Sequence, residues 1–106
     1  MTDRPTAETV LDVLGDESTR RVFGHLNSPV SAQSVADASG IPLSTVYRAL
    51  DRLEDADLAE RQIVIRDDGN RVFRFVRSTD RLDLTVEDGD IELLTDVPAA
   101  EAATVP

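Results

Sequence analysis

The chain has 106 residues, which allows one domain and a tail, and its 41% hydrophobic content is compatible with a packed core. It has no cysteine and one histidine, which excludes disulfides, thiolate metal sites and any site that needs two histidines. Twenty-one acidic residues against eleven basic ones give a net charge of −10, and every basic residue is an arginine. No apolar run approaches the roughly 18 residues that span a membrane.

The charge is unevenly distributed. Residues 20–77 carry nine arginines and eight acids, whereas residues 1–19 have a net charge of −4 and residues 78–106 one of −7. Any nucleic acid is therefore expected to bind the middle of the chain. The acidic, lysine-free and cysteine-free composition resembles the proteomes of haloarchaea, whose cytoplasm is rich in potassium salt; the alternative is a mesophilic acidic protein with a skewed base composition. Residues 1–5 lack the plan of a signal peptide, so we expect a cytoplasmic protein.

Helical patterns fill the first half of the chain. The apolar residues of 6–14 share one helical face, and Asp16 is a candidate N-cap for a second helix that should end at 27–29, because proline disfavours helical geometry in the residue before it. Ser31 is a candidate N-cap for a short third helix, and Gly40 stands where a turn with positive φ is expected. A fourth helix is predicted over 43–56, with a buried stripe of Val46, Leu50 and Leu53.

The period then changes to that of strands. Residues 59–66 and 70–77 are two β-prone runs around the turn cluster Asp67–Asn70, which predicts a β-hairpin. A second alternation surrounds Asp88-Gly89 and predicts another short hairpin within 82–94. We therefore expect an α+β chain with a domain at 1–77, an acidic hairpin extension at 78–94 and a flexible tail at 95–106.

Three helices, a tight turn before the last one and a hairpin are the order of a winged helix-turn-helix. The small Ala36, the turn residue Gly40 and the apolar Val46 have the spacing of a helix-turn-helix pair. Residues 14–76, which open with Leu14-Gly15-Asp16 and Thr19-Arg20-Arg21, resemble the winged-helix domain of ArsR-like regulators. The stretch 44–53 also resembles the PadR, TrmB and Fur winged helices.

Two departures from these families matter. They usually have glycine where Asp57 stands, so an altered end of the 43–56 helix is expected. Their metal-sensing members use Cys and His ligands that have no counterparts here, so no metal and no cofactor is expected.

The resemblance implies that helix 43–56 enters the major groove. Arg48 is then the best reader of guanine, and Arg52 is expected on a phosphate; the alternative for Arg48 is a surface ion pair with Asp51 or Asp55. The carboxylates of Asp67 and Asp68 at the hairpin tip would repel phosphates. The full set of expected DNA contacts is Ser44, Thr45, Tyr47, Arg48 and Arg52 on this helix, Ser31 and Gln33 on the preceding one, and Arg66, Asn70, Arg71 and Arg74 on the wing, taken as 66–74.

These features predict a sequence-specific, DNA-binding transcriptional regulator whose partner is double-stranded DNA. A homodimer is expected, through residues 6–14 and the 82–94 hairpin, whose apolar face would cover Val72 and Val76 or meet a second subunit; the alternative is a monomer whose second hairpin extends its own sheet. No membrane association and no small-molecule effector is evident. A protein-interaction module of the transcription machinery is the alternative function, and Tyr47 and Arg48 buried against other side chains would be its sign. An enzyme is not expected, since no nucleophile–base pair or phosphate loop is evident.

Overall fold

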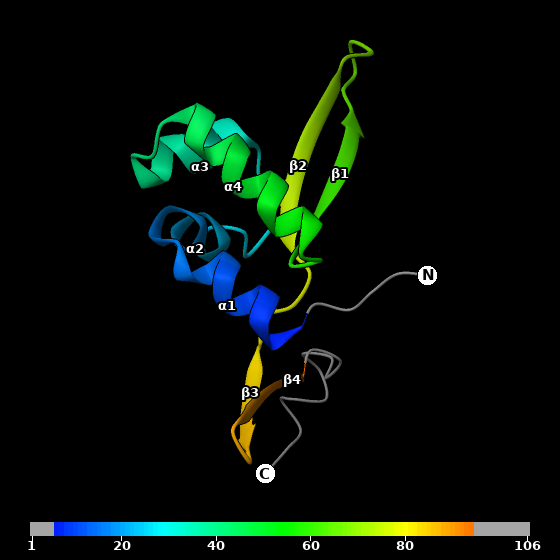
Figure 1. Ribbon diagram of the computed structural model, residues 1–106. Coiled ribbons are helices and arrows are strands. Elements are labelled where there is room, and N and C mark those ends of the chain that lie inside the picture. The colour runs from blue at the N-terminus through cyan, green and yellow to red at the C-terminus, as the bar shows by residue number, and fades with distance from the viewer. Residues whose placement is uncertain (1–5, 95–106) are drawn as a thin grey trace.

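The computed structural model describes residues 6–94. Four helices, α1 (Ala7–Gly15), α2 (Glu17–Gly24), α3 (Ala32–Ser39) and α4 (Leu43–Asp55), precede four strands, β1 (Ala59–Ile65), β2 (Arg71–Arg77), β3 (Asp83–Glu87) and β4 (Asp90–Leu94) (Figure 1). The expected α+β class with two hairpins is confirmed. None of the helices in this part of the chain is long and apolar enough to cross a membrane.

Side-chain oxygens begin the first three helices. Asp16 accepts a hydrogen bond from the backbone N–H of Thr19, and Ser31 accepts one from that of Ser34, as their positions predict. Helix α2 ends at Gly24, earlier than predicted from Pro29, because the N–H groups of His25 and Leu26 bond to carbonyls three residues back and tighten the last turn. Gly40 follows α3 with φ of 76°, which a glycine adopts without strain.

The core lies between the helices and the base of the first hairpin. The side chains of the predicted stripe of α4 are at most 1% exposed: Val46, Leu50 and Leu53. The stripe packs in one cluster with residues of every other helix and with Phe75 of β2. The buried side of α4 therefore fixes which of its side chains face outward.

The end of α4 keeps the form that glycine usually gives it. Asp57 adopts φ of 58°, the Leu58 N–H donates to the Leu53 carbonyl at 2.8 Å, and the Asp57 N–H donates to the Glu54 carbonyl at 3.0 Å. This is a Schellman motif, and its two flanking leucines, Leu53 and Leu58, are both buried in the core cluster. The expectation of an altered helix end is wrong, because the aspartate accepts the left-handed conformation.

The first hairpin pairs β1 with β2 in antiparallel register, with Ile63 opposite Phe73 and Ile65 opposite Arg71. Its base is tied to the helices by a bridge between Val30 and Phe75, and its far end extends beyond them (Figure 1). The hairpin therefore has a fixed base and a free tip, as a wing requires.

The second hairpin is a separate two-stranded sheet of β3 and β4. Leu82 and Leu93 pack against the core, and β4 lies beside α1 (Figure 1). The alternative in which this hairpin extends the first sheet is therefore wrong. The expected tail at 95–106 lies outside the described residues.

Candidate nucleic-acid interface

The outward side of α4 is open to solvent. Ser44, Tyr47 and Arg48 are exposed and Thr45 is half-buried, and the phenol-bearing side chain of Tyr47 is 51% exposed. These positions alternate with the buried stripe because side chains three and four residues apart share a helical face. Tyr47 and Arg48 are thus available to a partner rather than packed against other side chains.

The guanidinium of Arg48 makes no hydrogen bond or ion pair with any residue of 6–94. The alternative in which it pairs with Asp51 or Asp55 is not what the structure shows. Asp51 instead lies 3.8 Å from the guanidinium of Arg61. Within this part of the chain, all of the donors of Arg48 are therefore unused.

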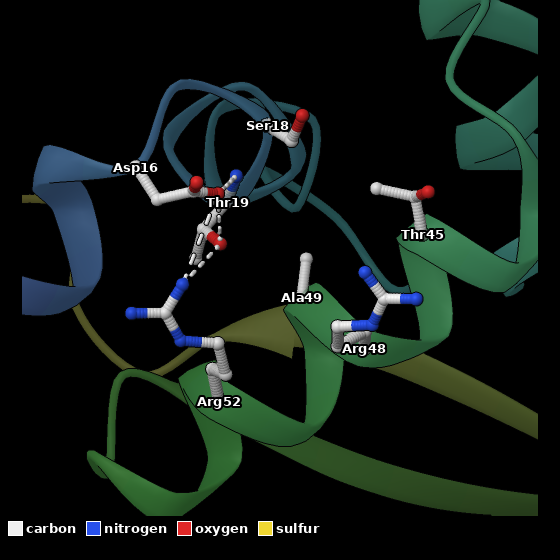
Figure 2. A pocket seen from close by; sticks show the side chains of 7 residues that line it. All are labelled: Asp16, Ser18, Thr19, Thr45, Arg48, Ala49 and Arg52. Atoms are coloured by element: carbon white, nitrogen blue, oxygen red, sulfur yellow. Dashed lines mark hydrogen bonds and ion pairs between the residues drawn. The ribbon is translucent and has the colours of Figure 1, made fainter.

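Arg48 and Arg52 line a small cavity of about 240 Å³ between α2 and α4. Figure 2 shows the two side chains on the same side of α4 but in different situations. The Nη1 of Arg52 donates to the Thr19 hydroxyl at 3.4 Å and lies 3.8 Å from the Asp16 carboxylate. Arg52, which was expected on a phosphate, is therefore held by α2.

The carboxylate of Asp16 organises this side of the cavity. It accepts hydrogen bonds from the backbone N–H of Thr19 at 2.9 Å and from its hydroxyl at 2.8 Å. These bonds, together with the positive charge of Arg52, lower the pKa of Asp16 below its ordinary value. Asp16 therefore stays charged and keeps Arg52 in place.

Three predicted wing arginines are also without partners among the described residues. Arg71 lies on the face of the hairpin that carries Phe73 and Phe75, Arg74 lies on the opposite face, and Arg66 directly follows β1. At the tip, Asp68 accepts hydrogen bonds from the backbone and side-chain nitrogens of Asn70 at 3.0 and 3.1 Å. The predicted contact Asn70 is thus engaged in shaping the turn, and so is one of the two tip carboxylates.

The two predicted contacts on α3 are engaged within their own helix. Ser31 caps α3, and its hydroxyl bonds to that of Ser34 at 3.0 Å. The side-chain nitrogen of Gln33 donates to Asp37 at 2.9 Å. In this arrangement the structure does not join them to the arginines of α4 and the wing.

Arg61 lies beside the candidate interface, and the sequence did not single it out. Its guanidinium donates two hydrogen bonds to Glu54 of α4, at 2.9 and 3.2 Å, and lies 5.2 and 5.4 Å from the ring centres of Phe73 and Phe75. The carboxylate of Glu54 raises the pKa of Arg61 above its ordinary value. Arg61 therefore locks the wing to the helix, and it also offsets acidic charge beside the exposed face.

The ten arginines of residues 6–94 divide into three groups. Arg20 and Arg21 donate to backbone carbonyls at the ends of α1 and α3. Four others pair with carboxylates: Arg52, Arg61, Arg77 and Arg81. The remaining four, Arg48, Arg66, Arg71 and Arg74, have no partner within residues 6–94. We call them the free arginines, and all lie on α4 or the wing. In a chain with almost twice as many acids as bases, this leaves the positive charge available where the predicted interface lies.

The helices α3 and α4, the glycine turn between them and the hairpin that follows decide the architecture. The chain has a winged helix-turn-helix fold. A family model described as "Helix-turn-helix domain" matches residues 14–62, from the end of α1 into β1. A crystal structure of the ferric uptake regulator (Fur) of Vibrio cholerae is similar to this chain with a TM-score of 0.50 and 22% identity. The similarity covers 84% of this chain and 76% of the Fur chain.

The comparison with curated proteins found no match for this winged helix-turn-helix chain. The described residues contain no group of three His, Cys, Asp or Glu side chains that could hold a metal ion. The site is therefore characterised by its free arginines, its exposed Tyr47 and the small cavity between α2 and α4.

Proposed function

We propose that this chain is a sequence-specific DNA-binding transcriptional regulator. Helix α4 would lie in the major groove, with the wing, residues 66–74, on the flanking DNA. One observation carries the proposal: the free arginines, Arg48, Arg66, Arg71 and Arg74, all lie on the two elements that a winged helix presents to DNA. The helix-turn-helix match supports the same assignment.

The side chains of α4 suit base and phosphate contacts. Arg48 would donate a pair of hydrogen bonds to O6 and N7 of guanine, and Ser44, Thr45 and Tyr47 would contact neighbouring bases or phosphates. Pro42, the N-cap of α4, makes no side-chain cap bond, and the Thr45 N–H already donates to the Pro42 carbonyl at 2.9 Å. Within the described residues, the N–H groups of Leu43 and Ser44 therefore stay open to a phosphate. The wing arginines would contact phosphates or the adjacent minor groove.

We further propose that the protein belongs to the ArsR-like group of winged helices and works in the salt-rich cytoplasm of a haloarchaeon. The lysine-free, acidic composition supports this environment. Phosphate contacts lose affinity steeply as salt rises, because the release of condensed counterions then contributes less. Affinity at molar salt would therefore rest on direct base contacts and apolar fit.

The exposure of Tyr47 and Arg48 favours DNA over the alternative of a protein-interaction module. In that alternative both side chains would be buried against other side chains, whereas Tyr47 is 51% exposed and Arg48 is exposed and unpaired in the described part of the chain. An enzymatic activity has no comparable support.

The test is selection of random double-stranded DNA by the purified protein in about 1–2 M KCl, which suppresses nonspecific phosphate attraction. We expect one enriched sequence, lost with Arg48→Ala. The matched control is Arg81→Ala, since Arg81 is an exposed arginine paired with Asp83 at 2.9 Å, away from α4 and the wing. Failure of the folded wild-type protein to enrich any sequence would contradict the proposed function.

We propose that the regulator binds its operator as a homodimer. Leu11 of α1, Leu84 and Val86 of β3 and Ile91 of β4 are 44%, 44%, 73% and 45% exposed. Leu84, Val86 and Ile91 share one face of the second hairpin, and Leu11 and Ile91 line a common surface pocket. An inverted repeat among the selected sequences, and a sedimentation mass of two chains that falls to one with Val86→Asp, would support the dimer. A monomer mass at working concentration would contradict it.

A further inference from the structure

The wing carries an exposed apolar patch that the free arginines do not explain. Ile63, Ile65 and Phe73 are 57%, 70% and 44% exposed, and we call them the wing patch. The register places Ile63 opposite Phe73 and Ile65 opposite Arg71, so all of these side chains lie on one face of the hairpin. Large exposed side chains gathered on one face indicate an interaction surface.

This face of the hairpin is the one turned toward α4. Towards the base, the same face carries Phe75, which is buried in the core, and Arg61, which is bonded to Glu54 of α4. In Figure 1 the hairpin and α4 diverge from this common end, and no helix lies opposite the outer part of the hairpin. The wing patch therefore borders the open angle between α4 and the wing.

The charge around the wing patch identifies its partner. Strands β1 and β2 carry four arginines and one acid, whereas β3 and β4 carry four acids and no base. The face that bears the wing patch has no acidic side chain among its eight paired positions on the two strands. A polyanion with apolar edges complements such a face, and duplex DNA offers both, in its phosphates and in its sugars and thymine methyl groups.

We propose that the wing patch packs against the sugar edges of the DNA backbone that passes between α4 and the wing. The inference rests on the proposed function and adds the chemistry by which the wing binds. Apolar burial is not screened by salt, whereas the contribution of phosphate contacts falls steeply with it. The wing patch thus supplies affinity at salt concentrations where the phosphate contacts of Arg66, Arg71 and Arg74 contribute little.

The test compares three variants on the selected DNA by fluorescence anisotropy between about 0.5 and about 2 M KCl, a range over which phosphate contacts weaken. The double variant Ile63→Thr/Ile65→Thr should bind about tenfold more weakly at every salt concentration, with the salt dependence unchanged. The matched control is Val64→Thr, the same kind of change in the same strand, on the opposite face. Arg71→Gln should instead lower the salt dependence by about one phosphate contact.

Equal affinities of the double variant and Val64→Thr, with wild-type protein that binds DNA, would overturn the inference and leave the proposed function standing. A change of sedimentation mass in the double variant would overturn it too, because the patch would then serve a second copy of the chain. No DNA binding by the wild type would refute both. If the double variant melts lower than Val64→Thr, the single change at Ile65, which is 70% exposed, decides by the same criteria.

Discussion

The left-handed residue at the end of α4 offers a direct test of the backbone strain in this chain. Asp57, at φ of 58°, follows α4 at a position where helices commonly end with glycine. A residue with a Cβ in this conformation costs roughly 1–2 kcal/mol, at the low end for aspartate, which tolerates it better than most. Its carboxylate also lies at the negative end of the helix dipole, at a cost of about 0.3–1 kcal/mol in low salt.

Asp57→Gly should therefore stabilise the protein. Relief of the backbone strain and of the charge outweighs the extra freedom of glycine in the unfolded chain, about 0.5–1 kcal/mol, and leaves a net gain of about 0.5–1 kcal/mol. For a chain of this size that gain raises Tm by about 4 °C. Asp57→Asn should gain only the charge component, and Asp57→Ala should fall below the wild type in high salt, because alanine lacks the local tolerance of aspartate.

The assay is thermal unfolding followed by circular dichroism, in about 0.5 M and about 3 M KCl, since salt screens the charge component and leaves the strain. Asp55→Gly is the matched control: it removes the same charge within α4, where there is no left-handed strain to relieve, and should not raise Tm in about 3 M KCl. Asp57→Gly less stable than the wild type in high salt would refute the reasoning, because position 57 would then carry no left-handed strain.

Two further changes test the contacts that hold the interface together. The hydrogen bonds from Thr19 and the charge of Arg52 lower the pKa of Asp16 in the folded state. The ionised Asp16 therefore stabilises the folded protein above the pKa that this group has in the unfolded chain, and this stabilisation is lost as pH falls below about 4. Asp16→Asn should therefore lower Tm near pH 7 and reduce the loss of stability between pH values of about 4 and about 2, and parallel melting profiles would contradict this. Arg61→Gln should lower the free energy of unfolding in denaturant by about 1 kcal/mol, because it removes the ion pair with Glu54 and the stacking on Phe73 of the wing. Arg81→Gln should lower it little, and equal effects of the two changes would show that Arg61 does not lock the wing.

Local signals in the sequence determined the helices, the hairpins and the core stripe of α4. Asp16, Ser31 and Gly40 act through hydrogen bonds and backbone conformation within a few residues, so their roles follow from position alone. The stripe of Val46, Leu50 and Leu53 follows from the period of the helix. The resemblance to winged helices rests on the same short-range spacing, and it predicted α4 and the wing as the interface.

Tertiary structure alone decided which arginines are free. Arg48 and Arg52 lie on one face of the same helix, yet among the described residues only Arg52 meets a partner, because α2 packs beside it and brings Thr19 and Asp16 within reach. Arg61 stands seven residues after Glu54, across a helix end and a turn into a strand, so their pairing depends on how the wing leaves α4. The sequence shows which residues are charged. Ion pairs, however, need two charged groups within a few ångströms of each other, and tertiary packing decides which groups come that close.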